Sequence, residues 1–158
     1  MEVYNEVLRA LRQIIRAIDL NSKKILKKYN LTGPQLLILK ELAEYGSCPV
    51  GTLAKKVSLS HATVTEIVDR LQKKGYVKRE KSVQDKRKVF VVLEDMAEEV
   101  LAKKPSLIQE EFVDEFVELP DWEQNLILSN FQKVAFLMNA EDIDASPILV
   151  NTSAVVAD

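Results

Sequence analysis

Residues 73–91 read Lys-Lys-Gly-Tyr-Val-Lys-Arg-Glu-Lys-Ser-Val-Gln-Asp-Lys-Arg-Lys-Val-Phe-Val, directly after an amphipathic helical pattern that opens at Ser60. Gly75 predicts the left-handed residue that often follows the end of a helix. Residues 76–81 and 88–93 alternate well enough to predict two strands, joined by the polar loop 82–87. The stretch therefore predicts a helix followed by a basic β-hairpin.

The residues before this stretch predict a helix-turn-helix. Thr32 and Gln35 have the spacing of a capping box, which predicts a helix that continues to about Gly46. A shorter helix is expected over 49–56, and Ser60 is expected to be the N-cap of the next one. The predicted buried stripe of that last helix comprises Val64, Ile67, Val68 and Leu71.

The two ends of the chain predict further helices. Apolar residues recur at helical spacing over 2–29, and two more helices are expected over 95–117 and 121–138. An N-terminal helix this long and apolar needs a partner, which favours dimerisation, although packing within one chain is the alternative. For the tail 139–158, which lacks Lys, Arg and aromatic residues, a mobile segment and a strap over a neighbouring subunit both remain open.

The expected fold class is therefore mainly α with a small antiparallel β-hairpin. We expect one domain over 1–158, in which a winged helix-turn-helix lobe at 32–93 lies between dimerisation helices at 2–29 and 95–138. The N-terminus lacks the pattern of a signal peptide, and no apolar run approaches the roughly 18 residues of a membrane span. These features and the single cysteine favour a cytoplasmic protein without a membrane partner or an internal disulfide.

The charge of the chain is divided between its two parts. The net charge is −2, but residues 1–93 hold 19 of the 22 Lys and Arg and only 9 of the 24 Asp and Glu. Nine of the basic residues lie within 70–90. A charge run is often only a solvated face, but this asymmetry follows the order of the predicted elements and favours a nucleic-acid partner.

Catalysis and metal binding find little support in the composition. His61 is the sole histidine and Cys48 the sole cysteine, so neither a Cys–His pair nor a set of His and Cys metal ligands is expected. We expect no enzyme activity, no metal and no cofactor. Cys48 is favoured as a packing residue, with a redox switch as the alternative.

The chain contains the motifs Leu53-Ala54, Ser60-x-x-Thr63-Val64-Thr65, Val68-Asp69-Arg70-Leu71, Lys74-Gly75, and Asp85-x-Arg87 followed by Leu93. Together, over residues 5–138, these motifs resemble the MarR family of bacterial transcriptional regulators. The family's wing usually ends Leu-Thr, with the threonine capping the next helix. Here Glu94 and Asp95 follow Leu93, so Asp95 is expected to cap. Residues 16–23, 31–36 and 143–147 further resemble the subgroup that regulates compatible-solute genes, such as those for ectoine.

The resemblance implies that the helix after Ser60 lies in the major groove of DNA. Ser60 and Thr63 are expected to contact phosphate, Thr65 a thymine methyl, Glu66 cytosine N4, and Arg70 guanine or phosphate. His61 and Lys73 are also expected to face DNA, whereas Asp69 is expected to hold a neighbouring arginine. Alternatively, Ser60 acts only as a cap and Glu66 rejects wrong sites.

For the hairpin, the resemblance implies that Arg87 enters the minor groove and that Asp85 orients it through a salt bridge. Lys81, Lys86 and Lys88 would add phosphate contacts. The expected function is a homodimeric transcriptional regulator, with repression as the favoured mode, that binds an inverted repeat. The alternative is a winged-helix module whose basic wing meets an acidic protein.

Two signals for such a regulator are considered. Relatives are often released by a small ligand, for which the candidate residues are Tyr4, Arg16, Tyr29 and Leu36, although core packing explains most of them equally well. The compatible-solute subgroup suggests ionic strength as the other signal, because protein–DNA affinity falls steeply with salt.

Overall fold

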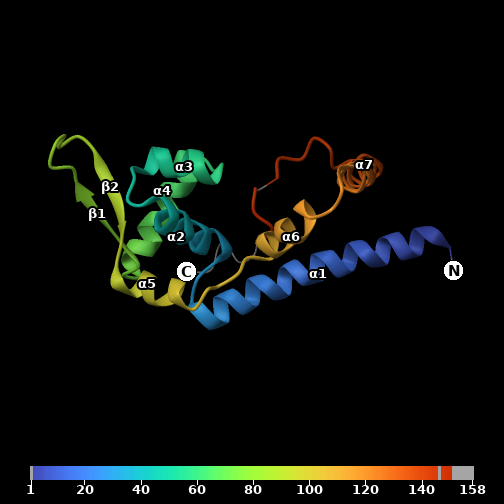
Figure 1. Ribbon diagram of the computed structural model, residues 1–158, viewed down its shortest axis with the longest axis horizontal. Coiled ribbons are helices and arrows are strands. Elements are labelled where there is room, and N and C mark those ends of the chain that lie inside the picture. Colours follow the sequence, from blue (N-terminus) through green and yellow to red (C-terminus); the bar gives the residue numbers. More distant parts are fainter. Residues whose placement is uncertain (1, 146, 151–158) are drawn as a thin grey trace. The chain divides into compact units, whose positions relative to one another are not determined.

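The computed structural model describes residues 2–145 and 147–150. In chain order its elements are α1 (Val3–Tyr29), α2 (Gly33–Tyr45), α3 (Val50–Val57), α4 (His61–Lys73), β1 (Val77–Lys81), β2 (Val89–Leu93), α5 (Asp95–Ala102), α6 (Ile108–Val117) and α7 (Asp121–Leu137) (Figure 1). The described chain forms two compact units, one of residues 2–105 with 147–150 and one of residues 106–145. The predicted fold class, mainly α with one antiparallel hairpin, is confirmed. Of the tail 139–158, residues 146 and 151–158 lie outside the described residues, so neither expectation for the tail is tested.

Helix α1 confirms the predicted N-terminal helix and is buried only near its end. Ser22, Ile25 and Tyr29 are its buried residues, and Asn30 closes it in the left-handed conformation with its N–H bonded to Leu26 O. The apolar residues of the first two thirds are largely exposed. The end of α1 therefore packs into the first unit, while most of the helix presents an apolar stripe.

The start of α2 confirms the predicted capping box. Thr32 Oγ1 accepts a hydrogen bond from Gln35 N at 3.3 Å, and Gln35 Oε1 accepts one from Thr32 N at 3.0 Å. Both residues are buried, so each satisfies a backbone amide that water does not reach. This cap fixes the first residue of the helix around which α3, α4 and β2 pack.

The helix-turn-helix is formed by α3 and α4, and its core follows the predicted stripe. Val64, Ile67, Val68 and Leu71 are all buried. After α4, Gly75 has φ +82°, Gly75 N bonds to Gln72 O and Tyr76 N bonds to Leu71 O. This pair of bonds is a Schellman motif, as Gly75 predicted, and it turns the chain directly into β1.

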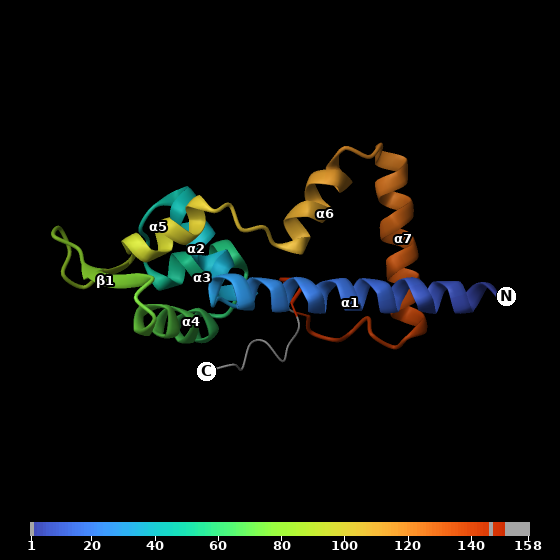
Figure 2. The ribbon, with the colours of Figure 1, turned by 90° about the horizontal axis from the view of Figure 1, so that it is seen from below.

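The hairpin pairs β1 with β2 in an antiparallel register that joins Val77 to Leu93 and Lys81 to Val89. Its base is anchored in the lobe, because Val77 and Val91 are fully buried and Val91 N donates to Cys48 O at 2.9 Å. Figure 2 shows the hairpin extending away from the helices of the first unit. The free end of the hairpin is thus solvent-exposed and basic.

Two predictions about the second half were wrong. The helix expected over 95–117 is two helices, because Pro105 lacks the N–H that a continuous helix needs and disfavours helical conformation at Lys104, whose φ is +50°. Asp95 does not cap α5: Glu94 occupies the N-cap position without a side-chain cap hydrogen bond, and Asp95 is the first helical residue. The carboxylate of Glu94 instead lies 3.5 Å from Lys78 Nζ.

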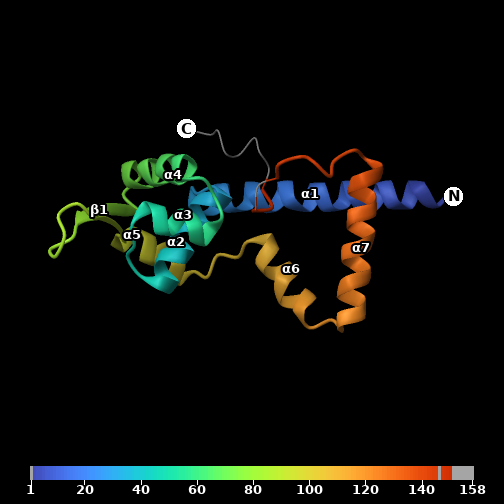
Figure 3. The ribbon, with the colours of Figure 1, turned by 90° about the horizontal axis from the view of Figure 1, so that it is seen from above.

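The second unit contains α6 and α7, joined by a short turn that ends at Pro120 (Figure 3). Helix α7 confirms the helix predicted over 121–138. Its large apolar side chains are about half exposed or more, namely Trp122, Leu126, Leu128, Phe131, Phe136 and Leu137. Among the described residues, no helix is long and apolar enough to cross a membrane.

Candidate nucleic-acid interface

The N-terminus of α4 is capped by Ser60, as predicted. Ser60 Oγ accepts from Thr63 N at 3.1 Å and lies 2.7 Å from Thr63 Oγ1. The amides of His61 and Ala62 lie in the first turn, where a helix offers no acceptor of its own. An exposed helix start of this kind favours an anion such as a phosphate.

The outer face of α4 carries the predicted contact residues. His61, Glu66, Arg70 and Lys73 are exposed, and Thr65 is half-buried. The Thr65 hydroxyl donates to His61 O at 2.8 Å, so its donor is already used within the helix. The methyl group of Thr65 is then the part of the side chain suited to an apolar contact.

The second half of α4 is bonded to β1 through Arg79. Arg79 Nη2 donates to Asp69 Oδ1 and Arg79 Nη1 donates to Gln72 Oε1, both at 2.6 Å. Asp69 therefore holds an arginine, as expected, but that arginine is Arg79, which sequence reasoning missed. The sequence nevertheless carried a signal for Arg79. Side chains of a strand alternate between its two faces, so Arg79 lies on the same face as the buried Val77.

The loop of the hairpin is shaped by its own polar side chains. Ser82 Oγ accepts from Gln84 N and Asp85 N, both at 3.2 Å. Asp85 Oδ1 accepts from the backbone N–H of Arg87 at 3.0 Å, and this bond stands in place of the expected side-chain salt bridge. The prediction that Asp85 orients Arg87 by pairing with its guanidinium is corrected: Asp85 fixes the backbone from which Arg87 projects.

The basic side chains at the free end of the hairpin are exposed to solvent. Lys81, Lys86, Arg87 and Lys88 are all exposed. They lie at the free end of the hairpin, while Arg70 and Lys73 lie on α4 of the same unit (Figure 1). The structure thus brings the predicted DNA-binding residues onto two neighbouring projections, one helix and one hairpin.

The end of α4 is also tied to the end of α1. Lys74 Nζ donates to Asn30 O at 2.9 Å, and Tyr76 Oη donates to Tyr29 O at 3.1 Å. Burial lowers the pKa of Lys74, and the positive charge of Arg70 lowers it further. These bonds satisfy carbonyl groups at the end of α1 that have no partner within that helix.

The four ligand candidates do not form one pocket within the chain. Tyr4 and Tyr29 lie at opposite ends of α1, which at a rise of about 1.5 Å per residue separates them by roughly 37 Å. Arg16 pairs with Asp19 at 2.8 Å, and Leu36 is fully buried. Tyr29 and Leu36 are core residues, which favours the alternative of core packing for these two.

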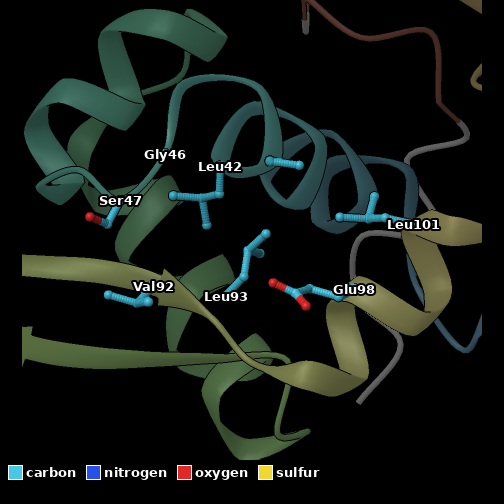
Figure 4. Close-up of a pocket in the computed structure, with 8 residues that line it drawn as sticks. Leu42, Gly46, Ser47, Val92, Leu93, Glu98 and Leu101 are labelled. Carbon is cyan, nitrogen blue, oxygen red and sulfur yellow. The ribbon is translucent and has the colours of Figure 1, made fainter.

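A different groove lies between the end of α2, strand β2 and α5 (Figure 4). It has a volume of about 450 Å³ and is lined by Leu42, Ala43, Gly46, Ser47, Val92, Leu93, Glu98 and Leu101. Sequence reasoning missed it because its walls are distant in the chain. Its lining is mostly apolar, and Glu98 supplies its one charged side chain among these eight residues.

Cys48 is buried beneath the hairpin, and burial raises the pKa of its thiol. A raised pKa lowers the thiolate fraction at neutral pH, and the thiolate is the reactive form. We expect iodoacetamide at pH 8 to alkylate Cys48 at least tenfold more slowly in the native protein than in urea, as followed by mass spectrometry. Equal rates would support the redox alternative.

Among the described residues, no group of three or more His, Cys, Asp or Glu is placed to hold a metal ion.

Comparisons with known proteins agree with this geometry. Residues 31–89 match the model of the MarR family. The HTH-type transcriptional regulator YsmB of Bacillus subtilis is 32% identical over 134 residues, which cover 80% of this chain and 90% of YsmB. The HTH-type transcriptional regulator MgrA of Staphylococcus aureus is 37% identical over 79 residues, or 50% of this chain and 54% of MgrA. In fold, the chain is similar to Lactococcus lactis ZitR, with a TM-score of 0.66 and 21% identity, covering 87% of this chain and 99% of that one.

Proposed function

Because the chain belongs to the MarR family of DNA-binding transcriptional regulators, we propose that it acts as a homodimeric repressor that binds an inverted repeat in double-stranded DNA. The members it resembles are transcriptional regulators and not enzymes. The observation that carries the proposal is the pairing of α4, with its open N-terminal amides, and the exposed basic hairpin in one compact unit. This pairing matches the major-groove helix and minor-groove wing of a winged-helix protein.

Individual contacts follow from the surroundings of each side chain. We assign phosphate contacts to Ser60, Thr63, Lys81, Lys86 and Lys88, because they lie at the helix start or on the exposed hairpin. Thr65, Glu66 and Arg70 face the major groove with His61 and Lys73 beside them. Arg87 enters the minor groove from a loop whose backbone Asp85 holds.

The apolar stripes of α1 and α7 support a homodimer. Large apolar side chains on both helices are substantially exposed in the single chain, including Tyr4, Leu8 and Ile15 on α1 and Trp122 and Phe131 on α7. An exposed apolar stripe of this kind on a helix marks a protein interface. A two-fold dimer presents its two α4 helices to major grooves about 34–36 Å apart, which an inverted repeat matches.

The signal that releases the DNA follows from the chemistry of the wing. Its phosphate contacts come from exposed lysines, whose binding to DNA weakens as salt competes for the phosphates. We propose that the target genes serve osmolyte synthesis or uptake and that ionic strength is the signal. A small ligand is the alternative signal, and the groove between α2, β2 and α5 is the place in the lobe where such a ligand would bind.

The experiment that tests the proposal is the substitution Arg87→Ala. We expect an A·T-rich operator duplex, selected with the wild-type protein, to bind about 10- to 100-fold more weakly, which corresponds to roughly 1–3 kcal/mol. Fluorescence anisotropy measures the affinity, and sedimentation shows whether the dimer is intact.

The matched control is Lys103→Ala, which removes an exposed basic side chain after α5. It should leave the affinity within threefold. Wild-type protein that binds no duplex more tightly than random DNA, but whose wing captures an acidic protein, would support the protein-interaction module instead.

A further inference from the structure

Arg79 is the one arginine of the hairpin whose guanidinium is bonded to α4 in the described chain. We propose that it is a positioning residue, which fixes the hairpin at the angle to α4 that lets the two bind adjacent grooves together. The inference rests on the proposed DNA-binding function and names the residue on which that geometry depends.

The geometry of the contact is that of a two-point clamp. The two terminal nitrogens of Arg79 donate to Asp69 and Gln72, each at 2.6 Å. Asp69 and Gln72 are three residues apart and so lie on neighbouring turns of one helix face. Because the guanidinium is planar and rigid, two bonds to successive turns fix its direction as well as its distance.

The position of Arg79 along the hairpin explains why this angle matters. Val77, closer to the lobe, and Val91, which pairs with Arg79 across the hairpin, anchor it in the core. Beyond Arg79, the side chains of Glu80 and Lys81 are exposed. Since a strand rises about 3.3 Å per residue, Ser82 lies roughly 10 Å beyond Arg79. A rotation of the hairpin by about 10° about Arg79 therefore moves the start of the loop by about 2 Å. Hydrogen bonds tolerate only a few tenths of an ångström, so such a rotation takes Arg87 out of register with its groove.

The clamp is expected to act on binding more than on stability. The Asp69 side chain is half exposed, and ion pairs at such positions contribute little to the free energy of folding. The Arg79 side chain is 28% exposed and already donates to two protein acceptors. Each of its two terminal nitrogens therefore directs one N–H at α4 in the free protein.

The test is a charge swap across the clamp. Arg79→Asp should weaken operator binding at least tenfold, and Asp69→Arg should also weaken it. The double variant Asp69→Arg/Arg79→Asp restores an ion pair between the same positions and leaves the net charge unchanged, so its affinity should return to within threefold of wild type. The matched control is Lys103→Asp, which makes the same charge change at an exposed residue of the same unit outside the hairpin and should weaken binding less than threefold.

Two further measurements separate a positioning role from its rivals. The dependence of log affinity on log salt should have the same slope in the double variant and the wild type. A double variant that stays weak, with a slope smaller by about 0.9 per subunit, would identify Arg79 as a phosphate ligand and overturn the proposal.

Amide hydrogen exchange tests the clamp in the absence of DNA. Faster exchange in the hairpin of Arg79→Asp, with the wild-type rate regained in the double variant, would support the clamp. Wild-type protein that fails to bind DNA would contradict the proposed function, and the exchange measurement would then test the clamp independently of it.

Discussion

Replacing Leu8 and Ile15 of α1 by glutamate is expected to convert the homodimer into monomers and to weaken operator binding by about 100-fold or more. The two residues are seven apart and lie on one side of the helix, and they are 41% and 66% exposed in the single chain. A dimer that covers them buries the exposed part of four such side chains, which is about half of the roughly 1.5–3 kcal/mol that complete burial of each is worth. The double substitution removes that contribution and places four carboxylates in the interface. Sedimentation measures the dissociation, and anisotropy measures the loss of binding.

The control for this experiment is Gln13→Glu/Ala17→Glu. These residues are exposed and lie about half a turn away on the polar face of α1. The control also adds two glutamates to the helix, so it separates the effect of position from that of charge. Circular dichroism should show both variants folded, because α1 is anchored in the first unit by Ile25 and Tyr29. A Leu8→Glu/Ile15→Glu protein that remains a tight dimer would exclude this face of α1 as the interface.

The parts of the fold that local chemistry determines could be predicted from the sequence. Thr32 with Gln35, Ser60, and Gly75 each satisfy backbone groups within a few residues of themselves, so their roles depend little on the rest of the chain. The buried stripe of α4 follows in the same way from a periodicity within one helix. The break at Pro105 had a local signal too, and the prediction of one continuous helix gave that proline too little weight.

The parts of the site that depend on how elements meet could not be predicted with the same success. The partner of Asp69 is ten residues away on a strand, and only the angle between α4 and β1 selects Arg79 for it. Asp85 and Arg87 are two residues apart, and that spacing suits a backbone turn as well as a salt bridge. The groove beside Glu98 is formed by three elements at once, so no single segment carries its signature.

The double substitution Lys86→Gln/Lys88→Gln is expected to reduce the salt dependence of operator binding sharply. If each lysine neutralises one phosphate, a dimer of the variant loses four phosphate contacts. The negative slope of log affinity against log salt then becomes shallower by about 3.6. Because such lines converge near 1 M salt, where phosphate contacts contribute little, the affinity at about 0.1 M should fall by roughly 4 × 10³-fold. Anisotropy titrations between about 50 and 400 mM salt measure both quantities. The matched control is Lys103→Gln/Lys104→Gln, which removes two exposed lysines after α5 and should leave the slope unchanged.

The same titrations decide whether the wing carries the ionic-strength signal. The lysines make contacts without sequence information, so their loss should weaken specific and random duplexes alike, whereas Arg87→Ala should weaken A·T-rich duplexes most. If the wing is the salt sensor, the Lys86→Gln/Lys88→Gln protein should dissociate from its operator over a much wider range of salt concentration than the wild type does. An unchanged slope would mean that these lysines are solvated in the complex. The salt response would then have to come from α4, and ionic strength acting through the wing would be excluded as the signal.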